Sequence, residues 1–423
     1  MKSNLWAILV LGLIIRLAIA PITGHAYDLA LWANYQRIFF GSGISDLRYF
    51  PTLPMLYYFQ LASYSFYALM RSLGLQDPLF FYHPTYAVEA VFLKLPMILA
   101  DMGVFLLFAR SGKLVPALLY YLNPFIIYLS SAWGTYDSLM MVFLVAGFTA
   151  LERDNKRLAT IAFTVSGLLK LFGFIPLGLL MLNSLGRRQF KSLLVQMTIV
   201  SSLVLTTLAP AILQIGSGTF YSEFSRFVGI STAQGRSWSA ISALTSSSSL
   251  PLVPEAAAPM IWIAYGSVPV AFAFLAWKKH SLFLSVLQAT LLGAVLLNIF
   301  SQAEPQWLSW PIPLALIFAS ATGRNGLRYF AYAFGAIATF LVMTLTGTGY
   351  LLFGLLGTSY LAPLEGFAGE IRVYAITTLS LLLLLLGYSI AKPVKFKLEA
   401  LILVVIIFAQ AYFWFSIVGI RSL

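Results

Sequence analysis

The chain has 423 residues, of which 60% are hydrophobic and 9% are charged, whereas soluble domains carry about 25% charged residues. Long apolar runs recur along its whole length, which excludes a soluble globular protein and predicts an all-α polytopic membrane protein. The net charge of +12 does not indicate nucleic acid as a partner, because the basic residues cluster between apolar runs. The absence of cysteine excludes disulfides and thiol chemistry.

The N-terminal run resembles a signal peptide, but Arg16 interrupts it and His25 and Asp28 follow at once, so we expect an uncleaved first helix. About thirteen membrane helices are predicted, several of them shorter than the roughly 20 residues of a full span. Their ranges are 5–21, 89–109, 114–131, 137–151, 158–169, 171–184, 193–213, 259–277, 282–301, 307–321, 329–349, 373–391 and 399–419. Segments 158–169 and 171–184 could instead form one long kinked helix, which would invert the topology downstream.

With the N-terminus inside, most of the 26 basic residues fall in the inner loops, as the positive-inside rule requires. The largest outer segment, 22–88, contains an apolar stretch at 54–73. Treating that stretch as a span would place Arg110 and Lys113 outside, so we expect one or two helices lying in the interface there. Residues 1–185 would then form one module, and 186–423 would form a second with outer loops 214–258 and 350–372.

Polar residues collect at the outer ends of the predicted helices and in the outer loops. Ionisable side chains near apolar helix ends are costly and are therefore functional candidates by default. The candidates are His25, Tyr27, Asp28, Tyr49, His83, Trp133, Tyr136, Asp137, Lys170, Arg236, Gln302, Glu304, Gln306 and Trp307. Because one topology places them all on the same face, we expect them to share one site.

Two aspartates have competing interpretations. Asp28 is the candidate catalytic carboxylate, but Asp is also a favoured N-cap and could merely start the next helix. Asp137 could likewise cap a helix, or it could contact a sugar together with Trp133 and Tyr136. Asp101 lies in the middle of a helix and is expected to pair structurally with another helix inside the membrane.

The candidate ligands for a donor phosphate are Lys170 and Arg236. Lys170 could instead snorkel to the interface, and Arg236 could be a solvated loop charge. His25 and His83 could bind a metal, but two histidines without a fixed spacing are weak support for one. We therefore expect a site without a metal or other cofactor.

Several motifs together resemble the GT-C glycosyltransferases that use polyprenyl-phosphate sugars, in particular the mannosyltransferases of the GPI-anchor pathway and the dolichyl-phosphate-glucose enzymes. The resemblance covers residues 1–185 and is thinner beyond them. The motifs are His25-x-Tyr27-Asp28…Trp32, Tyr49-Phe50-Pro51…Pro54…Tyr57-Tyr58, Lys94-Leu95-Pro96…Asp101, Leu122-Asn123-Pro124…Ser130…Trp133-Gly134-x-Tyr136-Asp137, Lys170-Leu171-Phe172…Pro176-Leu177 and Gln302…Gln306-Trp307…Trp310-Pro311.

This resemblance implies an inverting transferase with Asp28 as general base. It would move a hexose, first of all mannose, from a dolichyl- or polyprenyl-phosphate donor to a lipid-linked or glycan acceptor on the extracytoplasmic or lumenal face. A glucosyl- or other hexosyltransferase of the same fold is the alternative, and a polyprenyl-lipid flippase or transporter is the rival from another class. Transporters tend to place polar residues at the bilayer midplane between matched halves, a pattern that this chain lacks.

Overall fold

The computed structural model describes residues 2–42, 54–78, 86–216, 281–300 and 305–345, together with a few isolated positions. Within these residues the regular structure is helical and contains no strand, as the apolar runs predict. The first half holds α1 (Lys2–Ile19), η1 (Ala20–Ile22), α2 (Ala26–Ser42), α3 (Pro54–Ser72), α4 (Ala87–Arg110), α5 (Leu114–Tyr121), α6 (Pro124–Ile127) and the π-helix η3 (Tyr128–Trp133). There follow α7 (Asp137–Glu152), α8 (Lys156–Leu169), η4 (Leu171–Gly173), α9 (Phe174–Gly186), α10 (Phe190–Ile215), α14 (Leu282–Phe300), η6 (Pro305–Ser309), α15 (Pro311–Thr322) and α16 (Asn325–Leu345).

Three helical segments are long and apolar enough to cross a membrane: Leu5–Ile22, Ala87–Arg110 and Phe190–Pro210. The bent pair Leu114–Tyr121 and Pro124–Trp133 adds a fourth if it is one span. These segments are those expected of an integral membrane protein. Apart from isolated positions, the predicted runs 259–277, 373–391 and 399–419 lie outside the described residues, so the count of thirteen helices stays a prediction.

The predicted helix 114–131 is wrong as a single rod, because the chain bends by 51° between Tyr121 and Pro124. Asn123 interrupts the helix, and its side-chain oxygen accepts a hydrogen bond of 3.0 Å from the Phe125 amide. Pro124 is suited to the first turn of the new helix, where its missing N–H costs nothing. The segment continues as η3 and ends at Gly134, whose φ of 91° lies in the left-handed region.

Helices α8 and α9 form an antiparallel hairpin, so the alternative of one long kinked helix is wrong. Lys156 at the start of α8 donates a 3.1 Å hydrogen bond to the Gln189 side chain, which follows the end of α9. At the turn, a Cβ placed on Gly173 would lie 2.4 Å from the Gly167 backbone nitrogen. Glycine therefore permits the close approach of the two helices.

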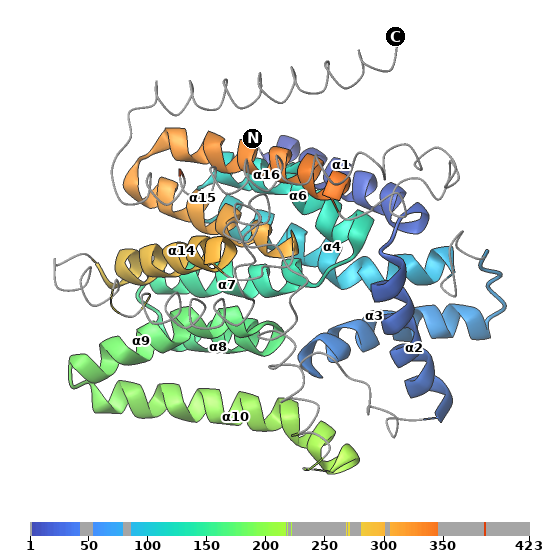
Figure 1. Cartoon of the computed structure of the whole chain (residues 1–423), viewed down its shortest axis with the longest axis horizontal. Coiled ribbons are helices and arrows are strands. Elements are labelled where there is room, and N and C mark those ends of the chain that lie inside the picture. Colours follow the sequence, from blue (N-terminus) through green and yellow to red (C-terminus); the bar gives the residue numbers. More distant parts are fainter. Residues whose placement is uncertain are drawn as a thin grey trace, which may run out of the picture.

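The first long predicted loop contains two helices, α2 and α3, as expected. Most helices of the bundle lie side by side, whereas α2 runs steeply across one end of them (Figure 1). Hydrogen bonds help to fix α3 to the bundle: Ser63 donates to the Phe92 carbonyl at 2.8 Å, and Tyr58 donates to the Thr207 carbonyl at 3.1 Å.

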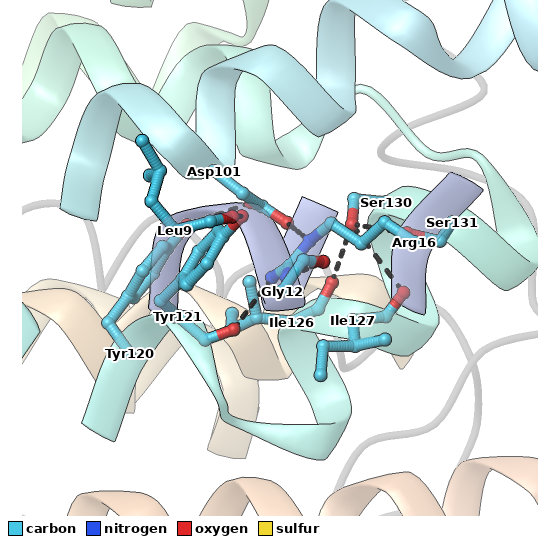
Figure 2. Close-up of polar contacts among 10 residues, drawn as sticks. All are labelled: Leu9, Gly12, Arg16, Asp101, Tyr120, Tyr121, Ile126, Ile127, Ser130 and Ser131. Carbon is cyan, nitrogen blue, oxygen red and sulfur yellow. Dashed lines mark hydrogen bonds and ion pairs between the residues drawn. The ribbon is translucent and has the colours of Figure 1, made fainter. Parts of the chain in front are cut away.

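A buried ion pair joins α1 to α4. Arg16 is fully buried, and its Nε donates to Asp101 Oδ2 at 3.0 Å (Figure 2). A second guanidinium nitrogen donates to the Tyr121 carbonyl at 2.8 Å, and the Tyr121 ring lies 4.2 Å from the guanidinium carbon. The expected pairing of Asp101 with another helix is confirmed, and Arg16 is its partner.

The two ends of the bundle differ in charge. Helix α7 runs from Asp137 to Glu152, and Glu152 forms an ion pair with Lys113, which places the loops after α4 and α7 at one end. Arg110, Arg153 and Arg157 also lie in or beside these loops, so we call this the basic end. The opposite end, where α2, α4 and α7 begin, is called the polar end and carries the candidate site.

Candidate active site at the polar end of the bundle

Asp28 is held by two neighbours from different parts of the chain. It lies in the first turn of α2, and its Oδ2 accepts a hydrogen bond of 2.8 Å from Trp133 Nε1. The Nδ1 of His25 lies 3.1 Å from the same oxygen. The Asp28 side chain is 28% exposed, so the carboxylate is oriented by protein on one side and open on the other.

His25, not Asp28, occupies the N-cap position of α2, so the capping alternative for Asp28 is wrong. The His25 carbonyl accepts the Leu29 amide at 3.0 Å, and its Nδ1 lies 3.4 Å from the Asp28 amide nitrogen. The amide contact needs a lone pair on Nδ1, whereas the carboxylate contact needs a proton there. Whether Nδ1 carries a proton therefore decides which of the two contacts His25 makes.

Lys94 holds together the two segments that carry Asp28 and Trp133. Its side chain is fully buried and donates to the carbonyls of Ala20 at 2.8 Å, Ser131 at 2.9 Å and Ala132 at 3.2 Å, and also to the Thr23 carbonyl. These contacts join the turn after α1 to the end of η3. The His25 amide adds a 3.3 Å bond to the Trp133 carbonyl. Lys94 thus holds the segment that leads to Asp28 against the segment that carries Trp133.

Asp137 forms a second acidic centre with Lys170. The ammonium lies 2.8 and 3.0 Å from the two Asp137 oxygens, and Trp310 Nε1 donates to Oδ1 at 2.7 Å. Asp137 is 1% exposed, and Lys170 is also buried. Two earlier alternatives are therefore wrong: Asp137 follows the N-cap residue Tyr136 and does not itself cap α7, and Lys170 does not snorkel to the interface.

Aromatic rings join the two acidic centres. The Lys170 ammonium lies 4.6 Å from the centre of the Tyr136 ring, which meets Trp32 of α2 edge-on at 6.3 Å. Trp310 stacks between Phe172 at 4.5 Å and Trp307 at 4.9 Å. Stacked rings beside fixed carboxylates offer apolar faces together with hydrogen-bond acceptors.

The structure gathers part of the predicted set. His25, Asp28, Trp133, Tyr136, Asp137 and Lys170 come together, and Trp307 joins them through Trp310. Gln306 lies beside Trp307 in η6, and Tyr27 follows Ala26 in α2. The remaining candidates lie outside the described part of the chain: Tyr49, His83, Arg236, Gln302 and Glu304.

The motifs of the resemblance include Trp32 and Trp310, but neither was selected as a site residue from the sequence. A buried indole N–H normally finds an acceptor, so Trp310 in an apolar segment was a signal for a buried carboxylate or carbonyl nearby. Sequence reasoning also missed a cluster at the start of α4, where fully buried Glu89 accepts from Arg37 at 2.9 Å and from the Tyr64 hydroxyl at 2.6 Å. Asp77 accepts the Glu89 amide at 3.0 Å and so caps α4.

No group of three or more metal-ligating side chains occurs in the described ranges. Fold and site together define a helical bundle of membrane type with two fixed carboxylates at one end. No protein-family model matches the chain, and a search of curated proteins finds no significant match.

Proposed function

We propose that this chain is an inverting GT-C-type glycosyltransferase of about thirteen membrane helices, with its site on the extracytoplasmic or lumenal face. The proposed reaction transfers a hexose, first of all mannose, from a dolichyl- or polyprenyl-phosphate donor to a lipid-linked or glycan acceptor. The observation that carries the proposal is the Asp28 carboxylate, which is fixed by Trp133 and His25 yet remains 28% exposed. The resemblance of residues 1–185 to that family supports it.

In this proposal Asp28 is the general base. The acceptor is a hydroxyl with a pKa far above neutral, and a positioned carboxylate that takes its proton in the transition state contributes typically ~10²–10⁴-fold. The hydrogen bond from Trp133 aims the carboxylate, and its exposed side is where the acceptor would approach. A single displacement then inverts the anomeric carbon as the C–O bond to the lipid phosphate breaks.

The departing lipid phosphate needs a cation. A charge-assisted contact from Lys or Arg would stabilise the negative charge that develops on it. Asp137 already neutralises Lys170, so we assign this role first to Arg236 and second to Lys170. The stacked rings of Trp307 and Trp310, beside Asp137, are the proposed surface for a sugar.

The direct test incubates the purified chain with synthetic polyprenyl-phosphate mannose, glucose or other hexoses and candidate acceptors, with the products read by mass spectrometry. Asp28→Asn should abolish transfer while the helical content stays unchanged. Asp154→Asn, at the basic end, is the matched control and should transfer normally. Normal turnover by Asp28→Asn would remove Asp28 as the base.

The same assay separates the rival functions. Preferred transfer of glucose or another hexose would replace mannose in the proposal. No transfer to any acceptor, combined with movement of the lipid across vesicles that contain the protein, would establish a transporter instead.

A further inference from the structure

A cavity of about 630 Å³ opens at the basic end, between the α7–α8 turn and the start of α10. Four basic side chains line it, and Asp154 is the one acidic residue in its lining. The basic residues are Arg153, Lys156, Arg157 and Lys191. The lining is therefore strongly cationic, and a phosphate fits that charge.

Gln196 supplies an independent sign of a ligand. It lines the same cavity from α10 and is 2% exposed. Neither its amide nitrogen nor its amide oxygen has a hydrogen-bond partner among the described residues. A buried amide without partners costs free energy, so a ligand or ordered water that satisfies it would be favoured there.

The surroundings of the cavity are apolar and exposed. Just 11% of the candidate span Phe190–Pro210 is buried within the protein. Leu194 is 67% exposed and Met197 is 50% exposed on α10, next to the cavity-lining Val195. A lipid bound with its headgroup in the cavity would lay its acyl chains on this surface.

We propose that this cavity binds the phosphate headgroup of an anionic phospholipid in the leaflet at the basic end. Basic pockets between membrane helices suit such headgroups, since each Lys or Arg near the surface attracts them. The bound lipid would link α8 to α10 through Arg157 and Lys191, and its headgroup would hydrogen-bond to Gln196. This proposal does not depend on the transferase function, because the cavity lies at the opposite end of α7 from Asp28.

The test titrates the full chain in detergent with short-chain phosphatidylglycerol and, separately, with phosphatidylcholine, and counts bound lipids by native mass spectrometry. Wild type should prefer phosphatidylglycerol. The double variant Arg153→Gln/Arg157→Gln should lose about 30-fold in that affinity, from about 1 kcal/mol for each charge. The matched variant Arg110→Gln/Arg187→Gln removes the same charge from the same end outside the cavity and should stay within about threefold of wild type.

Gln196→Leu provides a second variant that should fold at least as well as wild type, because it removes a buried amide without partners. It should still lose preference for phosphatidylglycerol over phosphatidylcholine. Equal preference in wild type and both cavity variants would overturn the proposal. Full competition by inorganic phosphate or glycerol phosphate would overturn the lipid assignment and leave a site for soluble anions.

Discussion

Trp133 and Asp28 are joined by a 2.8 Å hydrogen bond from the indole Nε1 to the carboxylate Oδ2, although they lie far apart in the sequence. Trp133 is the last residue of the π-helix η3, and Asp28 lies in the first turn of α2. The bond therefore fixes the position of η3 relative to α2. His25 stacks on the same indole at 5.2 Å and completes the arrangement.

Trp133→Phe keeps an aromatic ring for His25 to stack on and removes the N–H that aims Asp28. A hydrogen bond to a charged group contributes about 1.5–3 kcal/mol, so hexose transfer should fall about 10- to 100-fold. The fall should appear in kcat, because the lost hydrogen bond orients the proposed base for the chemical step. Trp6→Phe changes an indole that is 62% exposed on α1 and should leave turnover unchanged. Equal turnover in both variants would show that the Trp133 bond does not position the base.

Lys94→Met should destabilise the protein by about 3 kcal/mol or more, because several buried carbonyls lose their shared donor. Thermal unfolding in detergent measures this loss. Lys113→Met removes a lysine paired with Glu152 near the surface and should cost about 1 kcal/mol or less. Added ammonium ion should partly restore both stability and hexose transfer in the Lys94→Met variant but not in the Lys113→Met variant. The ion can occupy the position of the missing ammonium group among the same carbonyl oxygens. Equal costs for the two variants would contradict the structural role of Lys94.

Breaking the Arg16–Asp101 pair from one side should cost about 3–5 kcal/mol, because a buried charge is left without its partner. Arg16→Met and Asp101→Leu should each lower the melting temperature strongly. The double variant should be more stable than either single variant, because it leaves neither charge behind. A double-variant cost equal to the sum of the single costs would mean that the two residues act independently.

The cluster around Glu89 predicts a loss of stability in alkali. Burial, followed by the hydrogen bond to Glu89, raises the pKa of Tyr64 above its ordinary value of 10.0. The folded state therefore favours the neutral phenol, so this contribution is complete below the ordinary pKa and declines as the pH rises above it. Unfolding measured between about pH 8 and pH 11 should show the decline, and Tyr64→Phe should reduce its slope. Tyr329→Phe, at a tyrosine that is 51% exposed, should leave the slope unchanged.

The turn between α8 and α9 predicts opposite outcomes for two glycines. Gly173→Ala would place a Cβ 2.4 Å from backbone atoms of Gly167 and Ser166, so it should cost about 1–3 kcal/mol. Gly178→Ala, in α9, meets no atom within 4 Å and should gain about 0.5–1 kcal/mol from lower backbone entropy in the unfolded chain. Thermal unfolding of the two variants compares them directly, and a stable Gly173→Ala would contradict the close packing of the hairpin.

The apolar runs alone predicted the helical structure of the described residues and where most of those helices lie, because each run must satisfy its backbone hydrogen bonds within itself. The sequence also selected Asp28, Trp133, Asp137 and Lys170, since polar groups at apolar helix ends stand out against their surroundings. The hydrophobicity pattern predicted a single helix over 114–131, because it gives no sign of the break at Asn123.

Tertiary structure alone decided the pairings: Asp28 with Trp133, Asp137 with Lys170 and Trp310, and Arg16 with Asp101. Each partner lies on another element, and a sequence pattern reports the period of one helix but not which faces of two helices meet. Lys94 shows this most clearly, because its partners are backbone carbonyls, which every residue carries and no sequence motif marks.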